Sequence, residues 1–517
     1  MENLFKKNYF KNLYIFLLGV FSTFSLPPYN YFIINFITFS LFFIFLVKQK
    51  KYIKKKFNYF KYGWLFGFGY FLLSLYWITI ALTFDVNFKF LIPFALFLIP
   101  SFLAIFYGIA LYFFSFFKNN NNISLVLIFS ILFGIVEFIR GSILTGFPWN
   151  LFVFSFSNNL EFIQILSVVG TYGFNMICIT FFLMPAIFIM RKSGSEILVC
   201  LLFLFIAASF WAFGYKKLNN KNLFSYKENK YSIKIISSKI SIERFYNINN
   251  EKEIINDLIR VSEPDPDVPT IFIWPEGVLT STNLEDIKKY KNLFINNFTE
   301  KHLIVLGIND VLEENGNIKI YNSLAVVDRN LNVKNLYYKN NLVPFGEFLP
   351  LEKFLSNLGL RSITHGYQSF SKGIKREVIQ LKNEYFTFKF LPLICYEIIY
   401  SGKLFKKSNF DFIINISEDG WFGDSVGPHQ HFSNSIFRAI EEGKNIYRST
   451  NNGISAYING HGEIENVIET TQGGVLEITK IKKVQKTYFS KVGNKIFFYL
   501  LIIYISFIFF SNKRRMK

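Results

Sequence analysis

The segment Leu391-Pro392-Leu393-Ile394-Cys395-Tyr396-Glu397 ends a run of apolar residues in a cysteine that two polar residues follow. Residues 386–394 have the length and composition of a buried β-strand. A polar residue at the end of such a strand is typical of α/β domains, whose functional side chains gather at strand ends. An isolated cysteine is as often a small buried hydrophobe as a nucleophile, so its neighbours must decide between the two.

Similar apolar runs recur on both sides of this segment and alternate with stretches of helical spacing. The alternation predicts an α/β domain with a layered sheet. We find no internal repeat and no glycine-rich phosphate loop, which leaves nucleotide binding unsupported. The runs expected as strands are 231–236, 270–274, 303–306, 323–327, 386–394 and 412–416, and the stretches expected as helices are 251–261, 284–299 and 431–443.

The composition places another part of the chain in a membrane. Of the 517 residues, 51% are hydrophobic and 20% aromatic, more than a soluble surface usually tolerates. A membrane span needs about 20 consecutive apolar residues. Stretches of this kind predict a domain of seven transmembrane helices over 1–214, an α/β domain over 215–493, and a last helix with a short basic tail over 494–517. The predicted spans are 9–27, 29–48, 60–83, 90–117, 123–141, 161–190, 196–214 and 494–511.

The net charge of +20 comes largely from basic residues beside the predicted spans. They occupy 48–56, Lys118, 191–192 and 513–515, whereas the opposite connections carry little charge. The positive-inside rule then puts both chain ends in the cytoplasm and the α/β domain on the outer side. The alternative is that lysine is merely abundant in this sequence. Nucleic acid is not an expected partner.

Three cysteines, at 178, 200 and 395, form neither a disulfide framework nor a metal cluster. Cys178 and Cys200 lie inside predicted membrane helices, where they are packing residues. Only Cys395 remains for chemistry. No metal or organic cofactor is expected.

Two further segments offer what a nucleophilic thiol needs, a base and a positive charge. In Trp274-Pro275-Glu276-Gly277 a carboxylate directly follows an apolar strand, which suits a general base. In Tyr338-Lys339-Asn340-Asn341-Leu342-Val343-Pro344-Phe345-Gly346-Glu347 a turn holds a lysine near a glutamate, and the ammonium can stabilise an oxyanion. The simpler alternatives are a solvated glutamate and a surface ion pair.

A polar segment follows the predicted strand 412–416. It reads Ser417-Glu418-Asp419-Gly420-Trp421-Phe422-Gly423-Asp424-Ser425 and continues through His429 and His431 to Arg448-Ser449-Thr450-Asn451-Asn452-Gly453. The turn residues suggest a loop with exposed aromatic side chains, placed to enter the membrane interface. The histidines favour structural hydrogen bonding over a metal site, and a histidine base for Cys395 stays open as an alternative.

Together and in this order, these motifs resemble the apolipoprotein N-acyltransferases, the membrane members of the nitrilase superfamily. The resemblance spans nearly the whole chain and includes Gly146-Phe147-Pro148-Trp149-Asn150. It implies an αββα sandwich and a catalytic triad of Glu276, Lys339 and Cys395. It also implies supporting or substrate-binding roles for Glu347, Tyr396, Glu397, Asn322 and Trp421.

The sequence departs from the family pattern at two places. Ser237-Ser238-Lys239 stands where the family usually has Gln-x-Asn, and Glu418 replaces the usual asparagine before Asp419. These changes bear on local packing or substrate contacts, not on the triad.

The resemblance implies a ping-pong acyl transfer through a thioester on Cys395. The expected donor is a phospholipid, phosphatidylethanolamine, and the expected acceptor is the α-amino group of an S-diacylglyceryl apolipoprotein. A monomeric enzyme in the bacterial inner membrane, with its catalytic domain on the periplasmic side, is expected. Two alternatives remain, a membrane-tethered nitrilase-type hydrolase and a non-catalytic scaffold or transporter. The few intramembrane charges, chiefly Glu137 and Arg140, weigh against transport.

Overall fold

The computed structural model describes residues 8–50, 55–117, 121–220, 224–246, 250–314, 316–357, 369–402 and 409–513. They form two compact units. Lys51, Lys54, Lys118, Arg514 and Arg515 of the basic connections lie outside the described residues. The helical unit is drawn from Met1–Thr79, Phe90–Asn220 and Thr487–Lys517, and the sheet unit from Ile80–Lys89 and Lys221–Lys486.

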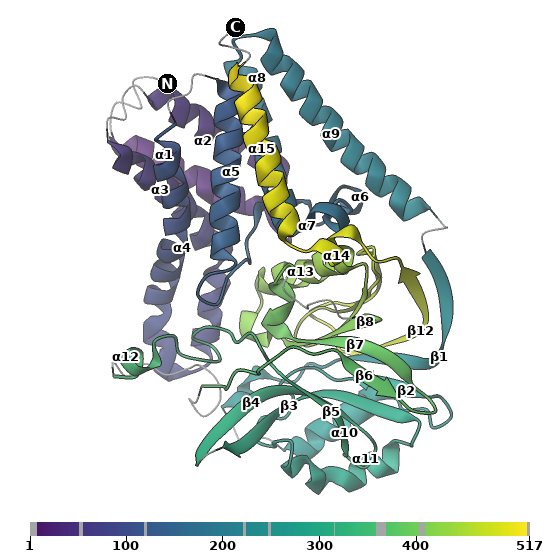
Figure 1. The fold of residues 1–517 in the computed structure, drawn as a ribbon. Helices are drawn as coiled ribbons and strands as arrows, with labels where there is room; N and C mark the ends of the chain where they lie inside the picture. The colour runs from purple at the N-terminus through teal and green to yellow at the C-terminus, as the bar shows by residue number, and fades with distance from the viewer. Residues whose placement is uncertain are drawn as a thin grey trace. The chain divides into compact units, whose positions relative to one another are not determined.

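The helical unit consists of apolar helices that coincide with the predicted spans (Figure 1). Within the described residues, five helices are long and apolar enough to cross a membrane, and six if α3 and η3, bent by 45°, form one span. The predicted total of eight spans stays a prediction. The α-helices are α1 Asn8–Ser22, α2 Ile33–Gln49, α3 Lys56–Ser74, α4 Ile92–Phe114, α5 Asn122–Arg140, α6 Leu160–Ile163, α7 Leu166–Phe182, α8 Met184–Met190, α9 Gly194–Asn219, α14 Tyr488–Val492 and α15 Lys495–Lys513; the 3₁₀ segments are η2 Thr23–Ser25, η3 Tyr76–Thr83, η4 Val86–Leu91 and η5 Phe152–Phe156.

Aromatic rings fill the interior of the helical unit. Phe42 stacks on Phe66 with ring centroids 4.6 Å apart, and Phe39 meets Phe152 edge to face at 4.7 Å. Glu137 and Arg140 are buried and form an ion pair of 2.5 Å at the end of α5. The two intramembrane charges therefore satisfy each other, as buried charges must.

The sheet unit is built on two six-stranded sheets. One sheet has the order β12-β1-β2-β3-β4-β5, with parallel pairing of β1, β2 and β3. The other has the order β11-β10-β9-β8-β7-β6, with parallel pairing of β7, β8 and β9. The strands are β1 Phe224–Ser237, β2 Thr270–Ile273, β3 His302–Glu314, β4 Asn317–Val327, β5 Val333–Tyr338, β6 Ile379–Lys382, β7 Thr387–Ile394, β8 Phe412–Glu418, β9 Asn445–Asn451, β10 Ser455–Ile458, β11 Ile464–Ile468 and β12 Gly474–Val484.

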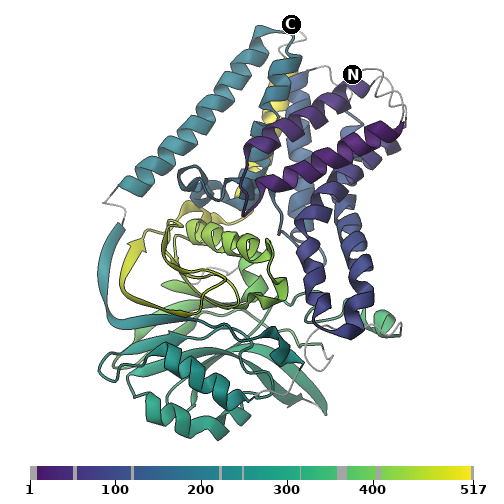
Figure 2. The ribbon, with the colours of Figure 1, turned by 180° about the vertical axis from the view of Figure 1, so that it is seen from behind.

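The two sheets pack face to face and helices cover their outer faces (Figure 2). The core between them joins Ile273 and Val305 of the first sheet to Phe390 and Ile414 of the second. A second cluster of buried apolar residues, which includes Trp274, packs between the first sheet and the helices that cover it. This arrangement confirms the predicted αββα sandwich. The covering helices are α10 Glu251–Ser262, α11 Lys291–Asn297 and α13 Gly427–Glu442, and short helical segments are η7 Ile242–Phe245, η8 Asp286–Tyr290, η10 Cys395–Ile399, η11 Asp419–Phe422 and α12 Glu352–Asn357.

The compact units differ slightly from the predicted boundaries. Helix α9 continues to Asn219, past the expected end at 214, because Lys216 and Lys217 extend its last turn with helix-forming residues. Residues Ile80–Lys89, which include the end of the predicted span 60–83, group with the sheets instead of the helices. Residues 487–493, expected in the α/β domain, group with the helices.

We expect replacement of Phe390 by alanine to destabilise the sheet unit by about 3–5 kcal/mol, because the ring is fully buried between the two sheets. Thermal unfolding of the detergent-solubilised protein measures the loss. Ile318→Ala on β4 is the control, since that side chain is 71% exposed. Equal melting temperatures for the two variants would contradict this account of the core.

Candidate active site

The candidate catalytic residues lie at the ends of strands from both sheets. Glu276 follows β2 and Lys339 follows β5, whereas Cys395 follows β7. Gly307 on β3 allows the chain at Glu276 to come close, because a β-carbon there would lie 2.6 Å from the Glu276 Cα. Cys395 has a positive φ of 48°, a conformation that costs free energy in a non-glycine residue and is typical of functional sites.

Lys339 lies between two buried carboxylates. Its Nζ is 3.2 Å from Glu276 Oε1 and 2.8 Å from Glu347 Oε1. Asn322 on β4 donates from one amide to the same two oxygens, at 2.7 and 2.8 Å. The backbone N–H of Val343 donates to Glu347 Oε2 at 2.9 Å. The structure thus brings together four of the predicted residues, Glu276, Lys339, Glu347 and Asn322. Hydrogen bonds and ion pairs link them to one another.

The electrostatics keep Lys339 charged. Burial would lower the pKa of the ammonium, but Glu276 and Glu347 beside it raise that pKa well above its ordinary value. Burial raises the pKa of the Glu347 carboxyl, and Lys339 offsets part of this rise. The site therefore holds a permanent positive charge at the place where an oxyanion would form.

Cys395 is surrounded differently. Desolvation and the nearby charge of Glu276 raise the pKa of its thiol, and Lys339 only partly opposes them. The thiol is therefore protonated at neutral pH and needs a base before it can attack. Glu276 is the carboxylate whose charge acts most strongly on it.

Glu397 joins the Cys395 turn to the Lys339 loop. One oxygen accepts from the backbone N–H groups of Asn340 at 2.9 Å and Asn341 at 3.1 Å, and the other accepts from Ile394 N–H at 2.9 Å. Arg376 Nη2 lies 2.6 Å from the first oxygen. Burial would raise the pKa of Glu397, but Arg376 and these donors lower it, so the Glu397 carboxylate stays ionised.

A second buried network lies under Cys395. Asp419 accepts from Ser417 Oγ at 2.6 Å and from Arg448 Nη2 at 2.8 Å, and His431 Nδ1 is 3.0 Å away. His431 Nε2 is 3.3 Å from the backbone oxygen of Cys395. These distances place His431 against the main chain of Cys395, as structural hydrogen bonding requires, and support the predicted structural role of His431 over a metal site.

The remaining predicted residues lie around this centre. Tyr396 is buried and packs edge to face on Tyr400, with ring centroids 5.5 Å apart. Trp421 is partly exposed and contacts Phe245 at 5.0 Å and Phe84 at 6.1 Å.

Sequence reasoning missed Arg376 and Arg244. Arg376 lies in no motif, and nothing in its surroundings marks it as the partner of Glu397. Arg244 pairs with Glu418, the residue that departs from the family pattern. A charged residue in place of the usual asparagine was the signal in the sequence for a counter-charge beside it.

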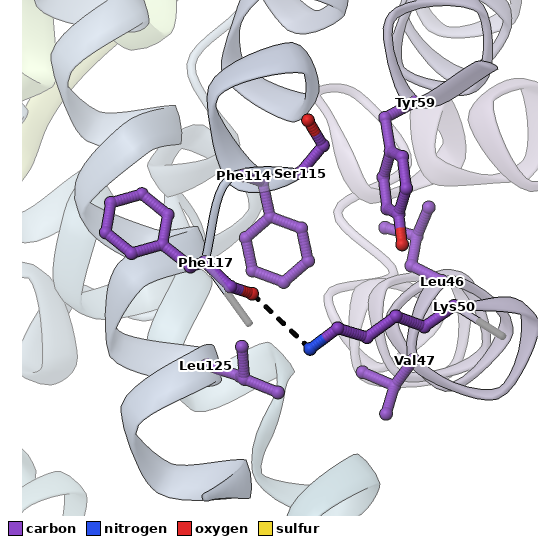
Figure 3. A pocket seen from close by; sticks show the side chains of 8 residues that line it. All are labelled: Leu46, Val47, Lys50, Tyr59, Phe114, Ser115, Phe117 and Leu125. Atoms are coloured by element: carbon purple, nitrogen blue, oxygen red, sulfur yellow. Dashed lines mark hydrogen bonds between the residues drawn. The ribbon is translucent and has the colours of Figure 1, made fainter. Parts of the chain in front are cut away.

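Among the described residues, no group of three or more His, Cys, Asp or Glu side chains could hold a metal ion. A small hollow in the helical unit contains none of the residues above (Figure 3). There Lys50 Nζ points to the backbone oxygen of Phe117 at 3.4 Å. The lining residues are Leu46, Val47, Lys50, Tyr59, Phe114, Ser115, Phe117 and Leu125.

Comparison with known proteins extends the resemblance over the chain. The family model of the apolipoprotein N-acyltransferase N-terminal domain matches residues 18–184, and that of carbon-nitrogen hydrolases matches residues 271–478. The apolipoprotein N-acyltransferase of Rickettsia typhi is 32% identical over 96% of this chain and 98% of its own length, and that of Rickettsia prowazekii is 33% identical over 87% and 90%. A nitrilase-superfamily amidase from Nesterenkonia is 13% identical over 49% of this chain and 91% of its own, with a TM-score of 0.34. The chain therefore belongs to the apolipoprotein N-acyltransferase family of enzymes.

Proposed function

We propose that the protein transfers an acyl chain from a phospholipid to the α-amino group of an S-diacylglyceryl cysteine at the N-terminus of a lipoprotein. The observation that carries the proposal is the buried Lys339 ammonium held by Glu276 and Glu347 beside the thiol of Cys395. A base, a cation and a nucleophile at adjoining strand ends are the parts that acyl transfer through a covalent intermediate requires.

In the first half-reaction, Glu276 takes the proton of Cys395 and the thiolate attacks the sn-1 ester carbonyl of the donor. The Lys339 ammonium and a backbone N–H near Cys395 stabilise the oxyanion of the tetrahedral intermediate. The ester C–O bond then breaks, and Glu276 returns the proton to the leaving alkoxide. Lysophospholipid departs and a thioester on Cys395 remains.

In the second half-reaction, the neutral amine of the acceptor cysteine attacks the thioester. Glu276 takes a proton from the attacking nitrogen, and the C–S bond breaks when the tetrahedral intermediate collapses. The Cys395 thiolate regains a proton from Glu276. An amide on the lipoprotein is the product, and the enzyme returns to its starting state.

The apolar helices give this chemistry a physical setting. Both proposed substrates carry acyl chains that are most stable in hydrocarbon, while their reacting groups must meet a polar site. We place the enzyme in the bacterial inner membrane as a monomer, with the catalytic domain on the periplasmic side. The basic residues beside the predicted spans support this orientation.

A hydrolase is the second candidate. The same triad would release a carboxylic acid if water resolved the thioester. The fate of the acyl group after it leaves the donor separates the two functions.

Mass spectrometry of the purified protein incubated with phosphatidylethanolamine tests the covalent step. We expect one acyl adduct on Cys395, and we expect none on the Cys395→Ser variant. Addition of a diacylglyceryl-cysteinyl peptide should remove the adduct as the peptide gains one acyl chain. Release as free fatty acid alone would identify the hydrolase, and a folded wild type without adduct would contradict both functions.

Loss of the base or the cation should slow acylation. We expect Glu276→Gln to reduce the rate of adduct formation by roughly 100- to 10,000-fold and Lys339→Met by about 100- to 1,000-fold, measured by quenched-flow mass spectrometry. Lys334→Met is the matched control, because this lysine lies on β5, the strand that Lys339 follows, but is exposed and pairs with Asp328. A Lys339 variant as fast as the control would remove the ammonium from the mechanism.

The resting state of Cys395 can be observed directly. Because desolvation and Glu276 raise the pKa of the thiol, we expect no thiolate absorbance in the ultraviolet at pH 7. The thiolate signal should appear only well above the ordinary pKa of a cysteine, and Cys395→Ser supplies the baseline. A thiolate already present at pH 7 would show that the thiol is activated before the donor binds.

A further inference from the structure

The buried ion pair between Arg244 and Glu418 holds neither the thiol nor the lysine, but it contacts Glu276 and the residue that follows it. Both side chains are almost fully buried, 2% exposed each. Arg244 lies on η7 and Glu418 ends β8, so the pair links two segments that are far apart in the sequence. A buried ion pair is weak evidence for stability alone, and its retention suggests another role.

The first contact is to the residue that follows the base. The Arg244 guanidinium donates to the backbone oxygen of Gly277 twice, from Nε at 3.0 Å and from Nη2 at 2.8 Å. Gly277 adopts a positive φ of 62°, so the turn after Glu276 has a conformation that favours glycine. The remaining guanidinium nitrogen donates to the backbone oxygens of Ile240 and Ser241 at 3.2 and 2.8 Å.

The second contact is to the base itself. The backbone N–H of Glu418 donates to Glu276 Oε2 at 3.0 Å, opposite the oxygen that faces Lys339. The Glu418 side chain fixes this backbone: one oxygen pairs with Arg244 and accepts from Asn451 at 2.7 Å, and the other accepts from Gly420 N–H at 2.8 Å. Both oxygens of the Glu276 carboxylate are therefore oriented, one by Lys339 and Asn322, the other through Glu418.

We propose that Arg244 and Glu418 are positioning residues, which fix the Glu276 carboxylate for proton transfer from Cys395 by holding Gly277 and the Glu418 main chain together. The inference rests on the proposed role of Glu276 as the base. Neither residue touches the reacting atoms. Without the pair, Gly277 and the Glu418 N–H move independently, and Glu276 loses one of the two anchors that aim it at the thiol.

The test separates positioning from stability. A single replacement leaves an unpaired buried charge, whereas replacement of both partners by apolar residues of similar size is often tolerated. We therefore use Arg244→Met/Glu418→Met in the full-length protein, with Lys482→Met/Glu463→Met as the matched control for another ion pair of the same sandwich. The probe is the rate of alkylation of Cys395 by iodoacetamide, followed by mass spectrometry.

We expect the double variant to melt near the wild type and to alkylate on the order of 10- to 100-fold more slowly, since small displacements of a catalytic group have effects of this size. Acylation by phosphatidylethanolamine should fall in parallel, while the half-saturating donor concentration stays unchanged. The control pair should react at the wild-type rate. A folded double variant that alkylates and acylates like the wild type would overturn the inference.

Two further variants make each outcome decisive. If the double variant unfolds, Arg244→Lys is measured in its place, because lysine keeps the charge but cannot donate twice to Gly277. An unchanged alkylation rate of Cys395 in Arg244→Lys would also overturn the inference. Glu276→Gln tests the underlying proposal. Wild-type acylation by phosphatidylethanolamine in Glu276→Gln would remove Glu276 as the base, whereas slow acylation there with a double variant that reacts like the wild type would refute the positioning role alone.

Discussion

The constraint on which the site depends is the burial of one ammonium between two carboxylates. Lys339 is 1% exposed, and its charge is acceptable in that place only because Glu276 and Glu347 surround it and Asn322 bonds to both. In a medium of low dielectric constant these interactions are stronger than in water. The same site sets the state of the thiol, since burial and the charge of Glu276 raise the pKa of Cys395 and Lys339 only partly opposes them. The arrangement thus produces a fixed cation and a protonated nucleophile at once.

The two sheets contribute different parts of this arrangement. The first sheet provides Glu276, Asn322 and Lys339, and the second provides Cys395 with the turn that follows β8. The apolar core between the sheets fixes their separation. At the strand ends, hydrogen bonds connect the two sheets: Glu397 links the Cys395 turn to the Lys339 loop, and the Glu418 N–H donates to Glu276. A well-packed core transmits small displacements, so the packing of the sandwich contributes to the geometry of the chemistry.

Much of the fold and the centre of the site could be predicted from the sequence, because Glu276 and Cys395 each follow an apolar run that reads as a strand. Strands β2 and β7 coincide closely with the predicted segments. Strands β5, β6 and β9 to β12 were not predicted, since their residues are mixed in polarity. The helix predicted over 284–299 is a 3₁₀ segment followed by the short α11. Glu418 signals a counter-charge, but nothing in the sequence identifies Arg376 or Arg244 as the partner of a carboxylate, since an ion pair between distant segments leaves no periodic trace.

The raised pKa of the Cys395 thiol has a consequence for how the enzyme meets its surroundings. A cysteine that was deprotonated in the resting enzyme would react with oxidants and with any electrophile that reached it, because the thiolate is the reactive form. Cys395 remains partly exposed, so access alone does not protect it. In the mechanism that we propose, protection comes from the proton, which leaves only when Glu276 accepts it, and the transfer is productive only when a carbonyl lies where Lys339 can stabilise the new negative charge. The buried charges that activate the site therefore also restrict its reactivity to a bound ester or thioester.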